Sequence, residues 1–341
     1  MTTRLAHAAA ALLGGEAARA EPLGGGCLEQ VTRVTLRDGR RVVVKGGPAP
    51  RVEATMLDAL RATGVPAPRV LAVDDALLVM EERPQRGAPA DAWADLGRVL
   101  ARLHAAEGTS YGWDVDYAYG PVTLPNAASD DWPGFWAERR LLAHAEQLPA
   151  DLARRVAALA ADLALRLPER PRPSLLHGDL WGGNVLVDGG RVSALIDPAC
   201  YFGHGEVDLA MLTLFDRPGE RFFEAYPIDS GWRERRPVYQ LWPAIVHLLL
   251  FGAGYRGMVE RLLREAGGSR RTDDQHSPLL PLDGSGTWVP KPPAAERRKP
   301  PRGRRAPPVR SRCARARRNR APASSRAAAP TVERWFRWAL R

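Results

Sequence analysis

The first 83 residues carry short apolar runs separated by polar turns, a pattern typical of β-strands. Two β-branched runs, 31–36 and 42–44, flank Asp38-Gly39. An Asp-Gly pair between such runs predicts a tight β-hairpin. The second run ends at Lys45, so the predicted hairpin carries a cationic side chain at the end of its second strand.

A helix is expected after this hairpin, because apolar residues recur at helical spacing until Gly64. The next segment, 65–73, holds two prolines and should be extended, and 76–80 is predicted as a buried strand. Together these elements predict a strand-rich N-terminal lobe over residues 1–83. The expected helix carries Val52, Met56, Leu57 and Leu60 on one face.

From residue 84 the apolar pattern becomes mainly helical. Two short strand signals interrupt it, at 174–176 and in a hairpin over 185–196 that turns at Asp188-Gly189-Gly190. A strand-rich small lobe followed by a helix-rich large lobe over 84–267 predicts an α+β, bilobal, protein-kinase-like fold. The helices of the large lobe are expected around 96–103, 152–163, 207–215 and 238–264.

The formal charge of +10 over 341 residues suggests a polyanion-binding protein until its distribution is considered. Residues 268–341 hold 19 Lys and Arg against 5 Asp and Glu, so the first 267 residues carry a net charge of −4. This Arg/Pro-rich tail should be disordered, because it lacks apolar periodicity until Trp335. A shifted reading frame in GC-rich coding sequence gives such a composition, and a genuine nucleic-acid-binding tail is the alternative.

The first twenty residues have only a weak secretory-signal pattern, because their Ala- and Leu-rich run is short and interrupted by Gly14, Gly15 and Glu16. A surface helix packed on the following lobe is the preferred interpretation. No stretch of the sequence reaches transmembrane length, so we expect a cytoplasmic protein that does not bind membranes. The cysteines match neither a disulfide framework nor a zinc site, since they are the widely spaced Cys27, Cys200 and Cys313.

Candidate chemistry concentrates in the segment His177-Gly178-Asp179-Leu180-Trp181-Gly182-Gly183-Asn184 and in Asp197. Asp179 and Asn184 keep the spacing that protein kinases use for a catalytic Asp and a metal-binding Asn. Asp197 follows an apolar lead-in, where kinases place a second metal-binding Asp. The set predicts phosphoryl transfer from ATP to a hydroxyl, with Asp179 as the base and Mg²⁺ held by Asn184 and Asp197.

The phosphate end of such a site is predicted in the N-terminal lobe. Gly24-Gly25-Gly26 would let the backbone approach phosphates, although a glycine run alone is more often an ordinary turn. Lys45 could neutralise the α- and β-phosphates, and Glu53 could hold Lys45 in place as its ion-pair partner. Backbone groups of Met80-Glu81-Glu82, where the lobes would join, could pair with the adenine edge.

Each candidate also has a plain structural alternative. Those alternatives are a turn-forming Asp179, a capping Asn184, a strand-ending Asp197 and a solvated Glu53. The joint order of these residues along the chain favours the catalytic interpretation. His177 is interpreted as bracing the loop, His104 as a core histidine, and Asp208 as a buried acceptor for the backbone N–H groups of the catalytic loop. Asp208 would also stabilise the start of its helix.

These motifs resemble those of the fructosamine (ketosamine) kinases, relatives of the aminoglycoside phosphotransferases with a protein-kinase-like fold. The loop that carries Trp181 is the specific part of the resemblance, which spans most of residues 5–267. The resemblance also rests on segments 22–27, 44–45, 111–113, 130–132, 197–203, 206–210 and 250–255.

The resemblance implies ATP- and Mg²⁺-dependent phosphorylation of the sugar part of ketoamines, such as fructosamines and ribulosamines on protein lysines, as a repair of glycation. It implies the catalytic and metal-binding roles given above, with Lys45 and Glu53 on the phosphates. Trp181 would then stack its indole on the sugar or its amine. The implied partner is a small ketosamine or a glycated protein lysine.

Two other functions stay open at this point. One is a kinase of another small hydroxylated amine, such as an aminoglycoside. The other is a nucleic-acid binder whose basic tail does the binding and whose kinase body is vestigial.

Overall fold

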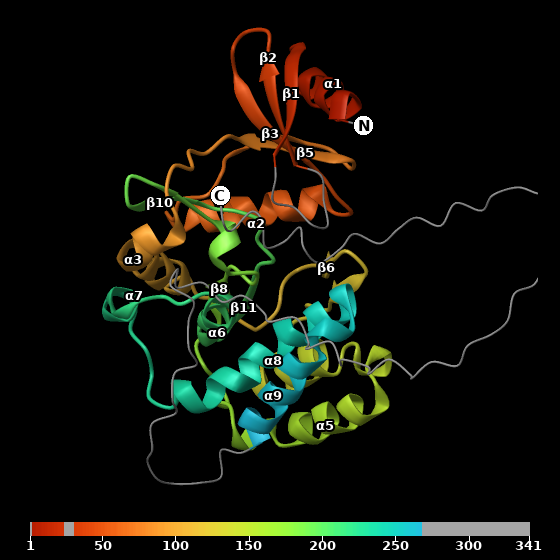
Figure 1. The fold of residues 1–341 in the computed structure, drawn as a ribbon, viewed down its shortest axis with the longest axis vertical. Coiled ribbons are helices and arrows are strands. Elements are labelled where there is room, and N and C mark those ends of the chain that lie inside the picture. The colour runs from red at the N-terminus through yellow and green to blue at the C-terminus, as the bar shows by residue number, and fades with distance from the viewer. Residues whose placement is uncertain (1, 24–30, 268–341) are drawn as a thin grey trace, which may run out of the picture.

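The computed structural model describes residues 2–23 and 31–267. A five-stranded antiparallel sheet forms a smaller lobe at the top of Figure 1, and a larger, mostly helical lobe lies below it. This is the bilobal α+β architecture that the sequence predicts. The glycine run, Cys27 and the basic segment 268–341 lie outside the described residues, so what was predicted of them stays a prediction.

The sheet of the smaller lobe has the strand order β1-β2-β3-β5-β4. The predicted hairpin forms its centre, with Val34 opposite Val42 and the turn at Gly39, whose φ of 87° suits glycine. The predicted helix is also confirmed, since its apolar face is buried and it ends before Gly64. The elements of this lobe are α1 (Thr2–Leu12), β1 (Ala17–Leu23), β2 (Val31–Leu36), β3 (Arg41–Gly46), α2 (Pro50–Ala62), β4 (Val70–Val73) and β5 (Leu77–Glu81).

The N-terminal helix α1 packs on the outer face of this sheet. Its alanines, among them Ala6 and Ala9, are buried against Val34 and Val44, as expected for a helix that belongs to the lobe. The neighbouring strand β1 was not predicted. It is an edge strand whose residues are all at least partly exposed, so its sequence shows none of the apolar alternation of a half-buried strand.

The larger lobe is built from helices, and one expected boundary was wrong. The single helix expected over 238–264 is two helices, because Gly252 takes a left-handed φ of 83° and ends the first of them. That first helix also starts earlier than predicted and contains Pro237 and Pro243. The helices are α3 (Trp93–His104), α4 (Trp132–Trp136), α5 (Ala150–Ala161), α6 (Glu206–Phe215), α7 (Glu220–Ala225), α8 (Trp232–Phe251) and α9 (Arg256–Gly267).

Three two-stranded ribbons interrupt the helices and carry the chain toward the junction of the lobes. The predicted hairpin is β9 (Val185–Asp188) with β10 (Arg191–Leu195), and it turns at Gly189 and Gly190, both with positive φ. The predicted strand β8 (Ser174–Leu176) pairs with β11 (Tyr201–Gly203). The ribbon of β6 (Tyr117–Tyr119) and β7 (Val122–Leu124) was not foreseen.

An aromatic cluster fills the centre of the larger lobe. Trp132, Phe135 and Trp136 are fully buried, so they belong to the core. The guanidinium of Arg140 lies 4.2 Å from the ring centre of Tyr201 and donates to the carbonyl of Pro125. In the part of the chain that the structure describes, no helix is both long and apolar enough to cross a membrane.

Candidate active site

Helix α6 holds the segment that carries the candidate base, Asp179, by hydrogen bonds to its backbone. Asp208, in the first turn of α6, is fully buried. Its carboxylate accepts the backbone N–H of His177 at 2.7 Å and that of Gly178 at 2.9 Å. These two contacts are the ones that the sequence predicted for Asp208, and they fix the backbone immediately before Asp179.

Glycine is the only residue type that fits at position 178, between His177 and Asp179. Its φ is 82°, and a Cβ atom added there would lie 2.0 Å from the carbonyl oxygen of Ala199. Backbone oxygens cannot move away as a flexible side chain could. The close approach lets Ala199 donate its N–H to the carbonyl of His177 at 2.8 Å, which ties the loop to the segment after Asp197.

His177 braces the loop through both ring nitrogens. Nε2 lies 3.0 Å from the carbonyl oxygen of Ile196, so it carries the hydrogen, and Nδ1 accepts the N–H of Asp179 at 3.3 Å. Burial lowers the pKa of His177, which keeps the ring neutral in this tautomer. These contacts are those of a bracing residue, in line with its interpretation from the sequence.

Asp179 and Asn184 meet across the turn that joins them. The Asn184 side-chain N–H₂ donates to Asp179 Oδ2 at 2.9 Å and to the Asp179 carbonyl at 2.7 Å. Burial raises the pKa of Asp179 to about 7, against the opposing effect of the hydrogen bond from Asn184. A carboxylate with this pKa can both accept and release a proton near neutral pH.

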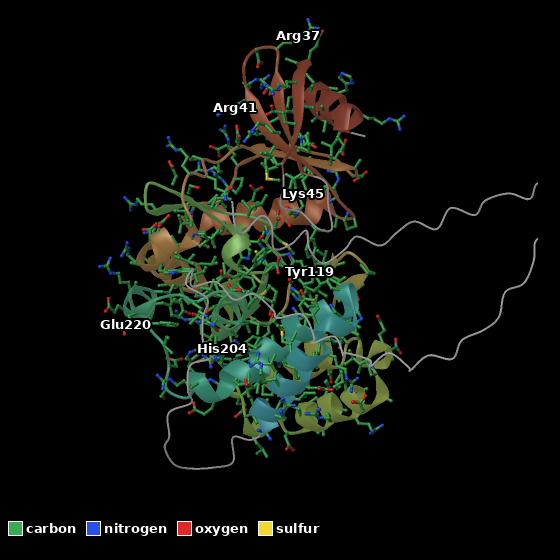
Figure 2. All side chains as sticks on the ribbon, in the orientation of Figure 1. Arg37, Arg41, Lys45, Tyr119, His204 and Glu220 are labelled. Atoms are coloured by element: carbon green, nitrogen blue, oxygen red, sulfur yellow. The ribbon has the colours of Figure 1, made fainter. Side chains whose placement is uncertain are left out.

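Lys45, Glu53 and Asp197 form an ion-paired group at the junction of the lobes, where Figure 2 labels Lys45. Lys45 Nζ lies 2.9 Å from Glu53 and 3.1 Å from Asp197 Oδ1. Lys45 and Glu53 are buried, whereas the Asp197 side chain keeps 35% of its surface exposed. Asp197 has a φ of 54°, unusual for a residue other than glycine and typical of strained functional sites. The structure thus brings Lys45 and Asp197 together across 152 positions of the chain, and the ion pair of Lys45 with Glu53 is the one that the sequence predicted.

The predicted adenine-binding segment ends strand β5 and begins the link between the lobes. Met80 is buried in the sheet, and the N–H of Glu81 donates to the carbonyl of Arg69 at 2.9 Å. The Glu82 carboxylate pairs with Arg33 at 2.6 Å and with Arg41. These side chains therefore stabilise the link, and adenine pairing by its backbone stays a prediction.

Comparison with known proteins decides the family. The sequence profile of fructosamine kinase matches residues 1–266. The chain belongs to the fructosamine kinase family. Membership confirms the resemblance seen in the sequence. The basic segment 268–341 lies beyond the family match.

Individual relatives agree with the family assignment. A probable ketoamine kinase of Synechocystis sp. is 38% identical over 190 residues, which cover 51% of this chain and 62% of that protein. The chloroplastic protein-ribulosamine 3-kinase of Arabidopsis thaliana is 37% identical over 175 residues, 48% of this chain and 53% of that protein. The chain thus spans between half and two thirds of the length of these curated relatives.

A solved structure gives the same answer for the fold. A protein of Thermobifida fusca assigned as a fructosamine-3-kinase shares 35% sequence identity, with a TM-score of 0.71. The match covers 78% of this chain and 99% of that one. The bilobal kinase-like fold of this fructosamine kinase family member is therefore confirmed.

One positioning residue of this family member was missed from the sequence. Asp216, just after α6, accepts the N–H of Gly182 at 2.6 Å, and a Cβ atom on Gly182 would lie 2.5 Å from Asp216 Oδ1. The two ends of helix α6 therefore hold the catalytic loop on both sides of Asp179. Asp208 binds the backbone that precedes Asp179, and Asp216 binds the backbone that follows Trp181. Burial raises the pKa of Asp216 to about 6. No pattern in the sequence marks Asp216, because an Asp at a helix end is ordinary.

Asp216→Ala is expected to lower kcat/KM for the acceptor about tenfold, because a hydrogen bond to a charged acceptor contributes about 1.5–3 kcal/mol. The Gly182 N–H would lose its partner, and the turn that carries Trp181 and Asn184 would loosen. Asp216→Asn keeps an oxygen acceptor and should restore most of the activity. Steady-state kinetics of both variants check this, and full activity of Asp216→Ala would rule out the role.

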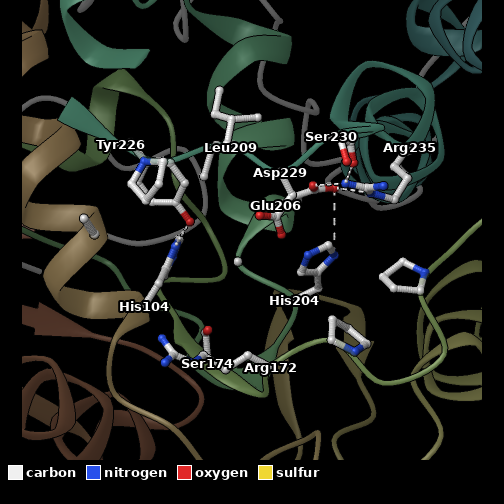
Figure 3. A pocket seen from close by; sticks show the side chains of 16 residues that line it. His104, Arg172, Ser174, His204, Glu206, Leu209, Tyr226, Asp229, Ser230 and Arg235 are labelled. Carbon is white, nitrogen blue, oxygen red and sulfur yellow. Dashed lines mark hydrogen bonds and ion pairs between the residues drawn. The ribbon is translucent and has the colours of Figure 1, made fainter. Parts of the chain in front are cut away.

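A cavity of about 580 Å³ lies between helix α3 and the start of helix α6, lined by His104 and Glu206 among others (Figure 3). His104 forms part of its wall, with Nδ1 2.7 Å from the Tyr226 hydroxyl and Nε2 3.0 Å from Asp208. His104 is therefore a satisfied core histidine, as the sequence indicated. His204, Glu206 and Asp229 come close enough to share a cation, but Glu206 is already ion-paired with Arg235.

Proposed function

We propose that this protein transfers the γ-phosphoryl group of ATP to a sugar hydroxyl of a ketosamine, as a fructosamine or ribulosamine 3-kinase does. The observation that carries the proposal is the joint geometry of Lys45, Glu53, Asp179, Asn184 and Asp197 in a member of the fructosamine kinase family. The name of the Arabidopsis relative, a protein-ribulosamine 3-kinase, supports the acceptor class.

In this proposal Asp179 takes the proton from the attacking hydroxyl. The Asp179 carboxylate is held by Asn184 from one side, while Asp208 fixes the backbone before it. The reacting oxygen must approach within hydrogen-bond distance of Asp179 and in line with the phosphoryl group. Trp181, half-buried with its indole against Gly183, offers a ring face to a sugar or its amine.

Lys45 is proposed to position the phosphates of ATP. Its partner Glu53 fixes the ammonium group, because a buried Lys is stable in its charged form only with an acidic partner. Glycines 24–26, outside the described residues, are proposed to cover the phosphates. This family member would then bind the nucleotide between its lobes.

Residues Asn184 and Asp197 fit a Mg²⁺ ion. Asn184 uses its N–H₂ group on Asp179, which leaves its side-chain oxygen as the atom for a cation, and the Asp197 carboxylate is partly exposed in the strained conformation described above. Oxygen ligands of this kind are those that Mg²⁺ takes in kinases. When bound, the ion would neutralise charge on the transferred phosphoryl group.

The acceptor is tested by measuring ATP consumption with fructosyl-lysine, ribulosyl-lysine, a glycated protein and a panel of aminoglycosides. We expect turnover with the ketoamines and little with the aminoglycosides. Activity confined to aminoglycosides would replace the proposed acceptor with another hydroxylated amine. A chain that turns over none of these acceptors and binds nucleic acid in a salt-sensitive manner would support a vestigial kinase body instead. The intact Lys45, Asp179 and Asp197 set weighs against that outcome.

A further inference from the structure

The unforeseen ribbon of β6 and β7 presents two tyrosines to the junction of the lobes. Tyr117 lies opposite Leu124 and Tyr119 opposite Val122, and directly paired residues of an antiparallel ribbon share one face. Val122 and Leu124 are buried in the core, which anchors the ribbon. Tyr117 and Tyr119 therefore extend that face, and both stay partly exposed.

Tyr119 contacts the catalytic loop beside the base. Its hydroxyl donates to the carbonyl oxygen of Gly178 at 3.1 Å, one residue before Asp179. Burial, together with the charge of Asp179, raises the pKa of Tyr119 well above its usual value, so the phenol keeps its proton and remains a donor. Figure 2 labels Tyr119 below Lys45 at the junction of the lobes.

Tyr117 reaches the other end of the site. It lines a narrow crevice, too tight for a water molecule, together with Lys45 and Glu53, the ion pair proposed to position the phosphates. The ring centres of Tyr117 and Tyr119 are 6.5 Å apart, in an edge-to-face arrangement. The two rings thus run from the phosphate end of the site to the base.

A phosphoryl group passes to the acceptor hydroxyl between the phosphate-binding Lys and the base. A strand that touches both ends of this path borders the place where the two reactants meet. We infer that Tyr117 and Tyr119 form the acceptor-binding wall of the active site, taking a hydroxylated ring that carries a cationic amine. The inference rests on the proposed function, because it assumes that Lys45 and Asp179 act in phosphoryl transfer.

The chemistry of the two rings fits a sugar attached to an amine. A partly exposed tyrosine offers an apolar face to the C–H groups of a sugar ring, and the same face attracts an ammonium group. Trp181 offers a further ring face on the catalytic loop. An acceptor without the amine should therefore lose affinity here.

The test compares Tyr119→Ala, Tyr117→Ala and Tyr119→Phe with the wild-type full chain, using the best acceptor from the panel above. Each Ala variant should raise the acceptor KM roughly tenfold while the KM for ATP stays within about twofold, because only the acceptor loses a ring contact. Tyr119→Phe keeps the ring and loses the hydrogen bond to Gly178, so kcat should fall about threefold with little change in acceptor KM. Phe223→Ala, a partly buried aromatic residue on α7 away from the junction, is the matched control and should change neither KM.

Two results would overturn the inference. One is an unchanged acceptor KM in both Ala variants at a retained melting temperature, and the other is an ATP KM that rises as much as the acceptor KM.

Failure of the proposed function is a separate result, because the wild type would then phosphorylate a different acceptor and the same variants would be measured with it. If the wild type phosphorylates no acceptor of the panel, hydrolysis of ATP by water is measured instead. Removing the wall should then change kcat for hydrolysis without changing the KM for ATP, and an unchanged hydrolysis rate would count against the inference.

Discussion

Asp179→Asn is expected to lower kcat for acceptor phosphorylation roughly 10³-fold while ATP binding is retained. The amide cannot take the proton of the attacking hydroxyl, but it preserves the shape of the side chain. Lys45 and Glu53, which hold the phosphate end, are untouched by the change. Steady-state turnover gives the first quantity and titration with a non-hydrolysable ATP analogue gives the second. Unchanged turnover would remove Asp179 as the base.

Asp188→Asn is the matched control for this variant. Asp188 ends strand β9 and pairs with the exposed Arg86 at 2.7 Å, so it carries the same charge a short way along the chain, outside the catalytic loop. Its replacement should leave kcat within about twofold of the wild type, since ion pairs with an exposed partner contribute little. A loss as large as that of Asp179→Asn would point to a general effect of charge.

The pH dependence should report the same residue. The base works as a carboxylate, and burial raises the pKa of Asp179 to about 7. Therefore kcat/KM of the wild type should rise with pH up to about 7 and flatten above it. Because this folded-state pKa lies above the 3.8 of an unperturbed Asp, ionisation of Asp179 costs stability, and the cost grows as the pH rises from 3.8 to about 7. Asp179→Asn should therefore raise the melting temperature most clearly above pH 7, while its residual activity loses the rise near pH 7.

The sequence predicted the local elements and the order of the chemical groups well, for physical reasons that apply to short segments. The Asp38-Gly39 hairpin and the α2 helix are set by turn chemistry and apolar period within a few residues. The kinase-like spacing of Asp179 and Asn184 predicts their contact, because the turn between them is too short to separate them. Asp208 followed from its place at the start of a helix after the motif.

What the sequence could not predict depends on contacts between distant segments. Strand β1 is held by pairing along an exposed edge, so its own residues carry no apolar signal. The Gly252 break could not be distinguished from a tolerated helical glycine without knowing how α8 and α9 pack. Asp216 and Tyr119 gain their roles only where α6 and β6 meet the catalytic loop, 34 and 59 residues away in sequence. The sequence alone does not encode such distances in a readable pattern.

Asp208→Ala should produce the largest loss of stability among the substitutions considered, about 3–5 kcal/mol in the free energy of unfolding. The change would leave the N–H groups of His177 and Gly178 without acceptors in a buried site, and Nε2 of His104 would lose its carboxylate partner. Water can hardly replace the carboxylate, because Asp208 is fully buried. Activity should fall with stability, since the lost contacts fix the backbone before Asp179.

Urea denaturation measures the change, and Asp151→Ala supplies the comparison. Asp151 pairs with Arg256 at the surface with 47% of its side chain exposed, so its removal should cost less than about 1 kcal/mol. Asp208→Asn separates charge from hydrogen bonding, because the amide keeps one acceptor oxygen but turns an N–H₂ group toward a backbone donor or His104. We expect Asn to lose less stability than Ala yet still impair turnover, since one of the two backbone N–H contacts would be gone. A fully stable Asp208→Ala variant would mean that β8, β11 and the Gly178–Ala199 contact hold the catalytic loop without α6.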